Sequence, residues 1–191
     1  MALELTRRRF TVADYYQIAA AGILGEDDRV ELIDGEILQM SPIGPRHAGT
    51  LVRLLGVFTR LETGVALVSP QNPLRLGDLF EPQPDIMILR PRSDSYTLAH
   101  PTAGDVLLLV EIADSSLEYD RQIKLPLYAR AGVPEVWLVN LNANLVELHR
   151  DPEVGGYRTV IVRRPGEWLA PRALPGQEVA VTDVLGESVA E

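Results

Sequence analysis

The stretch VLLLVEIADSS, residues 106–116, contains the strongest strand signal of this chain. Its first five residues are all apolar, which predicts a strand that is buried on both faces of a sheet. Glu111 then interrupts the run before Ile112 and Ala113. An ionised carboxylate inside such a strand costs several kcal/mol unless a positive charge compensates it. The sequence therefore predicts either a bound cation or a buried ion pair beside Glu111.

The segments that follow this strand predict a helix and a second strand. Residues 118–132, EYDRQIKLPLYARAG, are typical of a helix that ends at Gly132 and is kinked by Pro126. Residues 133–140, VPEVWLVN, are typical of another buried strand. Because a helix links the two strands, we expect them to form a parallel pair within a mixed sheet.

The first forty residues predict a helix and a hairpin. Thr11 and Asp14 form a capping-box pattern at the start of a short helix, and Gly22 is placed to end it. The Asp-Gly pair at residues 34–35 lies between two strand-like runs. This dipeptide is a strong signal for a tight turn between antiparallel strands.

The other elements complete a mixed α/β pattern. Apolar residues of segment 45–64 recur at helical spacing as far as Leu61, which predicts a long helix. Short strands are expected at residues 66–69, 74–76 and 85–89, and a hairpin at residues 144–164. We expect one α/β (α+β) domain over residues 1–191, with a mixed central β-sheet flanked by helices.

Composition limits the function classes. The chain of 191 residues has 27 acidic and 18 basic residues and a net charge of −9. This charge argues against broad adhesion to nucleic acid or anionic membranes, although a local basic groove stays compatible with it. The absence of cysteine limits a metal site to oxygen or imidazole ligands. With no apolar run of ~20 residues and no signal-peptide pattern, we expect a cytoplasmic protein without a membrane span.

Three acids occupy positions that suit a metal site. Asp85 opens one apolar strand, Glu111 lies within another, and Glu31 lies in the first strand of the hairpin. If these strands are neighbours, the carboxylates converge and a divalent cation relieves their repulsion. An all-oxygen site favours Mg²⁺ or Mn²⁺, which can polarise a phosphate and activate a bound water.

The helix after the central strand offers the basic group. Asp120, Lys124 and Tyr128 follow one another at intervals of four residues and share one helical face. Lys124 could reach the carboxylates, orient a water and steady a phosphate oxygen, with Asp120 holding it and the Tyr128 hydroxyl nearby. His47, near the start of a helix, either contacts phosphate or caps the turn.

Three blocks of the chain resemble the Uma2 family, formerly a domain of unknown function, in the PD-(D/E)xK superfamily of restriction-endonuclease folds. The blocks are VELIDGEILQMSP (residues 30–42) with the downstream His47, PDIMIL (84–89), and VEIADSSLEYDRQIKLPLYARAGVPEVWLVN (110–140). The resemblance covers about residues 11–140. It implies a restriction-endonuclease-like core and metal-dependent hydrolysis of DNA that leaves a 3′-hydroxyl and a 5′-phosphate.

The resemblance also assigns roles to individual residues. Asp85 corresponds to the Asp of the "PD" element, Glu111 to the acid of "(D/E)xK", and Glu31 to an additional acid of the first block. These assignments make Asp85 and Glu111 the metal ligands. Ala113 stands where the pattern has lysine, and the lysine role is expected to pass to Lys124 on the following helix.

Two other functions compete with the nuclease. Ala113 and the net charge favour a catalytically weak or inactive nuclease fold that serves as a binding or assembly module. A hydrolase of small phosphate esters is a third possibility. For the nuclease we expect a homodimer, because cutting two strands suits two sites related by a two-fold axis. The chain has neither a phosphate-binding glycine motif nor a GxSxG or HExxH motif, so those chemistries are unsupported.

Overall fold

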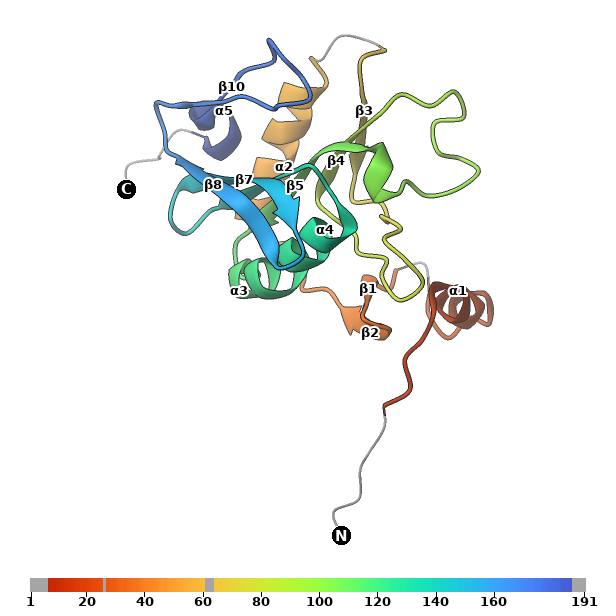
Figure 1. Ribbon diagram of the computed structural model, residues 1–191. Helices are drawn as coiled ribbons and strands as arrows, with labels where there is room; N and C mark the ends of the chain where they lie inside the picture. Colours follow the sequence, from red (N-terminus) through yellow and green to blue (C-terminus); the bar gives the residue numbers. More distant parts are fainter. Residues whose placement is uncertain (1–6, 26, 61–63, 187–191) are drawn as a thin grey trace.

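A six-stranded mixed sheet forms the centre of the fold (Figure 1). The computed structural model describes residues 7–25, 27–60 and 64–186. In spatial order the strands are β3 (Leu67–Pro70), β4 (Ile86–Leu89), β5 (Val106–Ala113), β6 (Glu135–Asn140), β7 (Leu145–Glu153) and β8 (Gly156–Arg163). The β5–β6 pair is parallel and the other neighbours are antiparallel. The expected mixed sheet is confirmed, and β5 has the bounds that the apolar run predicts.

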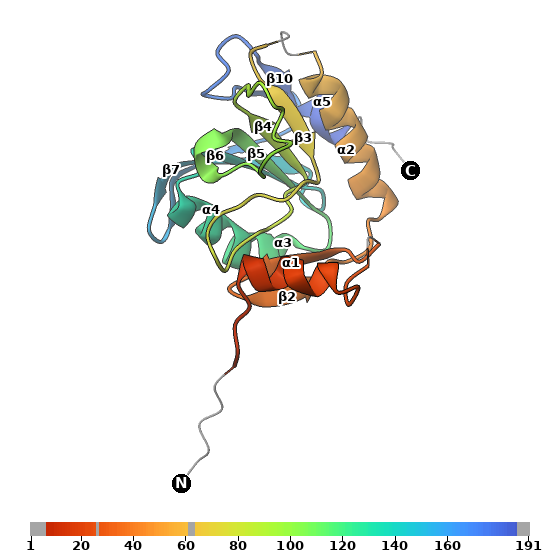
Figure 2. The ribbon, with the colours of Figure 1, turned by 90° about the vertical axis from the view of Figure 1, so that its right-hand side faces the viewer.

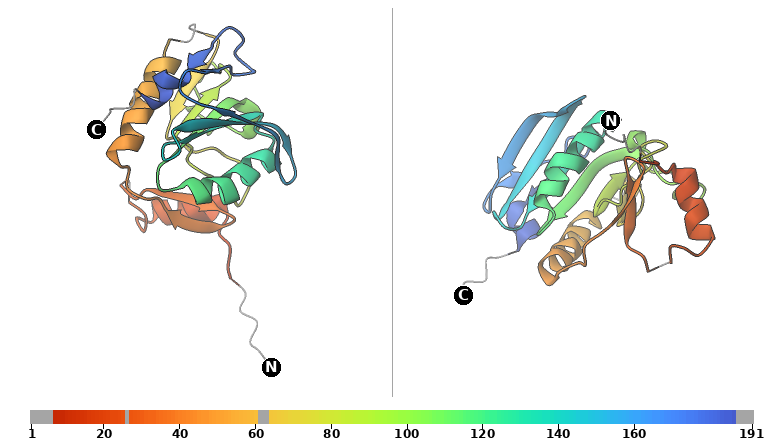
Figure 3. Two further views of the ribbon diagram at one scale, coloured as in Figure 1. Left: turned by 90° about the vertical axis from the view of Figure 1, so that its left-hand side faces the viewer. Right: turned by 90° about the horizontal axis from the view of Figure 1, so that it is seen from below.

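Helices cover both faces of this sheet (Figures 2 and 3). On one face, α2 (Pro45–Phe58) and α5 (Val181–Leu185) pack on a core that includes Trp137 and Ile112. On the other face, α3 (Leu117–Tyr119) and α4 (Leu125–Ala131) belong to one helical segment, and Tyr128 packs against Leu138 and Leu109. Both faces of β5 and β6 are therefore buried, which explains why their sequences are apolar without alternation.

The helical segment after β5 contains a π turn between α3 and α4. In this turn, Asp120–Lys124, the N–H of Leu125 bonds to the carbonyl of Asp120. Pro126 lacks an N–H and cannot continue a regular hydrogen-bond ladder, so the expected disturbance takes the form of this turn. The segment ends at Gly132, whose φ of 85° belongs to the left-handed region.

The N-terminal part forms a small unit that lies below the central sheet in Figures 1 and 2. Thr11 caps α1 (Val12–Ala20) through a capping box with Asp14, as expected. Strands β1 (Val30–Ile33) and β2 (Glu36–Gln39) pair antiparallel around the predicted Asp-Gly turn. A bridge between Leu32 and Glu81 ties β1 to the loop before β4. Glu31 is thereby brought beside that loop.

Some predicted bounds were wrong. Residues 74–76 form no strand, because Arg75 pairs only at an isolated bridge with Thr102. The helix α2 ends at Phe58 instead of near residue 64, and Leu61 lies outside the described residues. The two-residue strands β9 (Trp168–Leu169) and β10 (Val179–Ala180) were not predicted. In the described part of the chain, no helix has the length and apolar character that a membrane span requires.

Candidate active site

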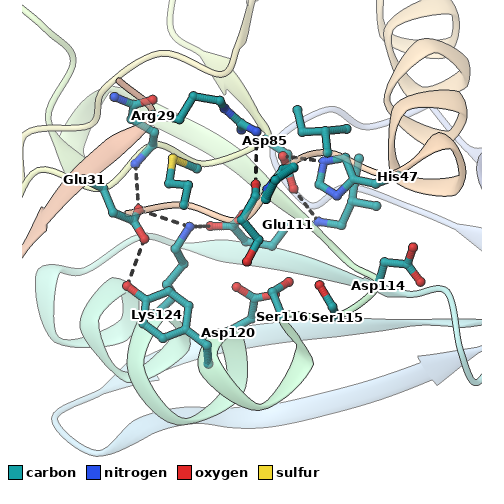
Figure 4. A pocket seen from close by; sticks show the side chains of 18 of the residues that line it. Arg29, Glu31, His47, Asp85, Glu111, Asp114, Ser115, Ser116, Asp120 and Lys124 are labelled. Carbon is teal, nitrogen blue, oxygen red and sulfur yellow. Dashed lines mark hydrogen bonds and ion pairs between the residues drawn. The ribbon is translucent and has the colours of Figure 1, made fainter. Parts of the chain in front are cut away.

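A cavity of about 530 Å³ lies where the β1–β2 hairpin meets the central sheet. Its walls come from the hairpin and residues 38–44, the start of α2, the ends of β4 and β5, and the helical segment after β5. All four predicted catalytic residues line it: Glu31, Asp85, Glu111 and Lys124. Figure 4 shows that these side chains come from four separate segments and point toward one another.

Asp85 is held at the start of β4 by two hydrogen bonds. The antiparallel register pairs Ile86 with Val110, so Asp85 lies beside the end of β5. Its Oδ2 accepts the N–H of Ile112 at 2.8 Å, and its Oδ1 lies 2.9 Å from Nε2 of His47 (Figure 4). The predicted "PD" acid is thereby fixed next to Glu111 by backbone pairing.

Glu111 lies buried at the centre of the cluster, with only 3% of its surface exposed. Its Oε1 accepts the hydroxyl proton of Tyr128 at 2.5 Å and lies 3.2 Å from Nζ of Lys124. Burial raises the pKa of Glu111 to about 8, against the opposing effect of Lys124, and the charges of Asp120 and Asp85 raise it further. Two features therefore make Glu111 tolerable inside the strand: Lys124 lies beside it, and burial favours its protonated form.

Lys124 joins two acids from opposite sides of the cavity. Its Nζ lies 3.3 Å from Oε2 of Glu31 as well as 3.2 Å from Glu111. Burial alone would lower the pKa of Lys124, but the charges of Glu111 and Glu31 outweigh it and raise that pKa. Lys124 therefore stays charged, and Glu111 is the partner that takes up a proton as the pH falls.

The auxiliary residues predicted from the sequence also reach this cluster. Burial opposes protonation of His47, but the hydrogen bond and charge of Asp85 raise its pKa. Asp120 is buried, which raises its pKa, and it accepts the hydroxyl proton of Ser116 at 2.7 Å. The carboxylate of Asp120 is therefore buried, and its negative charge helps to raise the pKa of Lys124.

Sequence reasoning missed Tyr119, Gln83 and Arg29, which line the cavity near Glu31. The hydroxyl of Tyr119 donates to Oε1 of Glu31 at 2.9 Å, and the N–H of Gln83 donates to its Oε2 at 3.2 Å. Arg29 lines the wall next to Glu31. The position of Tyr119 beside Asp120 and that of Gln83 two residues before Asp85 are signals that could have found two of them.

The cavity contains more acids than cations. Five carboxylates line it: Glu31, Asp85, Glu111, Asp114 and Asp120. Arg29 and Lys124 are its only arginine and lysine side chains among the described residues. Across the described ranges, no three acidic or histidine side chains come together as a ready-made metal cluster. Mg²⁺ needs only one or two carboxylates and completes its shell with water or phosphate, so Asp85 and Glu111 fit this ion.

The mixed sheet and its acid–lysine cluster define a restriction-endonuclease-like fold. The chain belongs to the Uma2 family, whose model, described as "Putative restriction endonuclease", matches residues 12–182. This membership supports a nuclease-like function. A crystal structure of "a putative nuclease belonging to DUF820" from Anabaena variabilis ATCC 29413 shares the fold, with a TM-score of 0.73 and 17% sequence identity over 92% of this chain and 97% of that chain. No curated protein matches the chain.

Proposed function

We propose that the protein is a divalent-metal-dependent endonuclease that hydrolyses phosphodiester bonds in DNA. The observation that carries this proposal is the excess of buried carboxylates around Lys124 in a cavity of about 530 Å³. Anionic phosphate is repelled by such a site unless a cation is also present. Families of the restriction-endonuclease type generally use divalent metals, which agrees with this charge balance.

Each residue of the cluster has a role in the proposed reaction. Asp85 and Glu111 would hold Mg²⁺ or Mn²⁺, which when bound polarises the phosphate and lowers the pKa of a water. Lys124 would orient the attacking water and stabilise negative charge on a phosphate oxygen. Glu31 would keep Lys124 in place, and His47 would keep Asp85 in place.

The proposed reaction is a simple hydrolysis. The water oxygen forms a bond to phosphorus, and the bond from phosphorus to the 3′ oxygen breaks. The 3′ oxygen receives a proton, so the products are a 3′-hydroxyl and a 5′-phosphate. We further propose that the protein acts in the cytoplasm as a homodimer, with two sites related by a two-fold axis.

Nicking of supercoiled plasmid with Mn²⁺ tests this proposal. We expect wild-type protein to nick the plasmid and Glu111→Gln to lose activity by at least about 100-fold, as expected for removal of a charge that acts in the transition state. Glu118→Gln, an exposed acid at the start of α3, is the matched control and should keep full activity. An equally active Glu111→Gln variant would refute the assigned site.

A binding or assembly module is the second candidate function. It is favoured by the contacts that Lys124 already makes with Glu31 and Glu111, because these contacts compensate part of the buried negative charge without a metal. Plasmid that stays intact with wild-type protein, together with a melting temperature that Mn²⁺ leaves unchanged, would favour this function. Cleavage of a chromogenic phosphodiester with no action on DNA would indicate a small-ester hydrolase.

A further inference from the structure

The acids of the proposed active site lie deep below the protein surface. Only 3% of Glu31, 3% of Glu111, 4% of Lys124 and 7% of Asp85 is exposed. A phosphate that reaches these groups must therefore enter the cavity, because it cannot touch them from outside. This depth restricts the shape of nucleic acid that can react.

One wall of the cavity belongs to the β1–β2 hairpin and the chain after it, and it is largely apolar, although Gln39 and Ser41 also line it. Leu38, Met40, Pro42 and Ile43 line this wall, and each keeps part of its surface accessible. Tyr119 lines the cavity as well, next to Glu31. An accessible apolar wall beside a polar cluster suits a ligand that has a flat apolar part and a charged part. A nucleotide has this composition.

The size of the cavity selects against a duplex. A volume of about 530 Å³ is typical of sites that enclose one small molecule. Bases in a duplex are stacked and paired, so a phosphate and its base can enter such a cavity only after unpairing. A single strand needs no unpairing, and its exposed bases readily pack against protein side chains.

The cavity also offers few positive charges for contacts to a nucleic-acid backbone. Proteins hold duplex DNA through many Lys and Arg contacts to phosphates. Arg29 and Lys124 are the cavity's arginine and lysine among the described residues, and Lys124 is already paired with two acids. The affinity for nucleic acid must therefore come from contacts inside the cavity, whereas many other DNA-binding proteins obtain it from a broad basic surface.

We propose that the substrate is single-stranded nucleic acid, or an unpaired segment such as a flap, with one base against the wall of Leu38, Met40 and Ile43. The phosphate next to this base then lies at Asp85 and Glu111. This inference rests on the proposed nuclease function, and it adds the substrate class. The apolar side chains contact the base and the acidic cluster receives the phosphate, so the two together orient the strand in the cavity.

Cleavage of matched substrates tests the inference. One labelled DNA strand is incubated with protein and Mn²⁺ as a single strand, as a blunt duplex, and as a duplex with an unpaired flap. We expect the single strand and the flap to be cut at least about tenfold faster than the duplex, with flap cuts in the unpaired segment. Equal or faster cutting of the duplex would overturn the inference and leave the nuclease function standing. No cutting of any substrate would refute both.

A binding measurement tests the apolar wall without relying on cleavage. Fluorescence anisotropy of the labelled single strand is recorded with Ca²⁺, another cation that prefers oxygen ligands. Met40→Asp should weaken binding of the single strand at least about tenfold, because a charged side chain replaces the apolar contact with the base. Val52→Asp, on the exposed side of α2 with 68% exposure, is the control and should bind like wild type. Unchanged binding by Met40→Asp would overturn the placement of the base.

Discussion

Glu111 and Glu135 are buried acids in neighbouring strands of one sheet, yet their surroundings differ. Glu135 opens β6 and is 1% exposed. It accepts hydrogen bonds from Nε1 of Trp137 at 2.8 Å, from Nε and Nη2 of Arg150 at 3.0 and 2.7 Å, and from the N–H of Arg172 at 2.9 Å. Each carboxylate oxygen has a partner, and Arg150 balances the charge.

Less positive charge compensates Glu111 than compensates Glu135. It shares Lys124 with Glu31, and Asp85 and Asp120 add negative charge nearby. It also lines the cavity, whereas Glu135 does not. The comparison teaches that a buried acid in an apolar strand indicates a functional site only where acids outnumber cations beside a cavity. Where an arginine and backbone groups satisfy the acid, its role is structural.

The largest effect that separates the two acids concerns stability. Glu135→Ala should lower the free energy of unfolding by about 3–5 kcal/mol, because Arg150, whose side chain is only 11% exposed, loses its charged partner. Urea unfolding measures this change. The folded variant should keep the plasmid nicking of the wild type, so loss of cleavage by folded Glu135→Ala would contradict the division between the two acids.

Mn²⁺ should stabilise the folded protein by binding at Asp85 and Glu111, and it should not bind at Glu135. At a free concentration about 100 times the dissociation constant, a single site that binds only the folded state adds about 2.7 kcal/mol. We expect this stabilisation in wild-type protein and its loss in Asp85→Asn, which keeps an acceptor for the N–H of Ile112. Thermal unfolding with and without Mn²⁺ provides the measurement. An equal shift in both proteins would place the metal elsewhere.

The pH dependence should also follow Glu111. Burial raises its pKa from 4.5 to about 8, so between these values the folded protein keeps a proton that the unfolded chain releases. The stability from this group is therefore present at low pH and is lost as the pH rises through about 8. Relative to Glu111→Gln, wild-type protein should lose up to about 1.4 kcal/mol per pH unit in this range. Parallel unfolding curves for the two proteins at pH 5.5 and at about pH 8 would contradict the raised pKa.

The smallest effect is expected at an exposed ion pair. Arg158 and Glu153 lie 3.4 Å apart with side chains 68% and 57% exposed. Arg158→Ala should change stability by at most about 0.5 kcal/mol, because solvent screens the pair. Urea unfolding beside Glu135→Ala checks this contrast. If Arg158→Ala lowered the free energy of unfolding as much as Glu135→Ala does, burial would not be what makes the Arg150–Glu135 pair more stabilising than the Arg158–Glu153 pair.

Much of the fold was predictable because its signals are local. The predicted strand that contains Glu111 has the bounds of β5, and the Thr11–Asp14 capping box and the Asp-Gly turn at residues 34–35 lie where expected. Caps and tight turns depend on neighbouring residues, so a single sequence contains them. The π turn before Leu125 was not predicted, because Pro126 indicates a disturbance without specifying its form.

The acids, the lysine and the elements that carry them could be identified from the sequence alone. The three-dimensional arrangement was needed to show that Glu31 and Glu111 share Lys124, that His47 contacts Asp85, and that these residues line one cavity. The same is true of the ion pair between Glu135 and Arg150. The physical reason is that the charge of a buried group depends on partners from distant segments, whereas the strand that buries it depends on its neighbours in the chain.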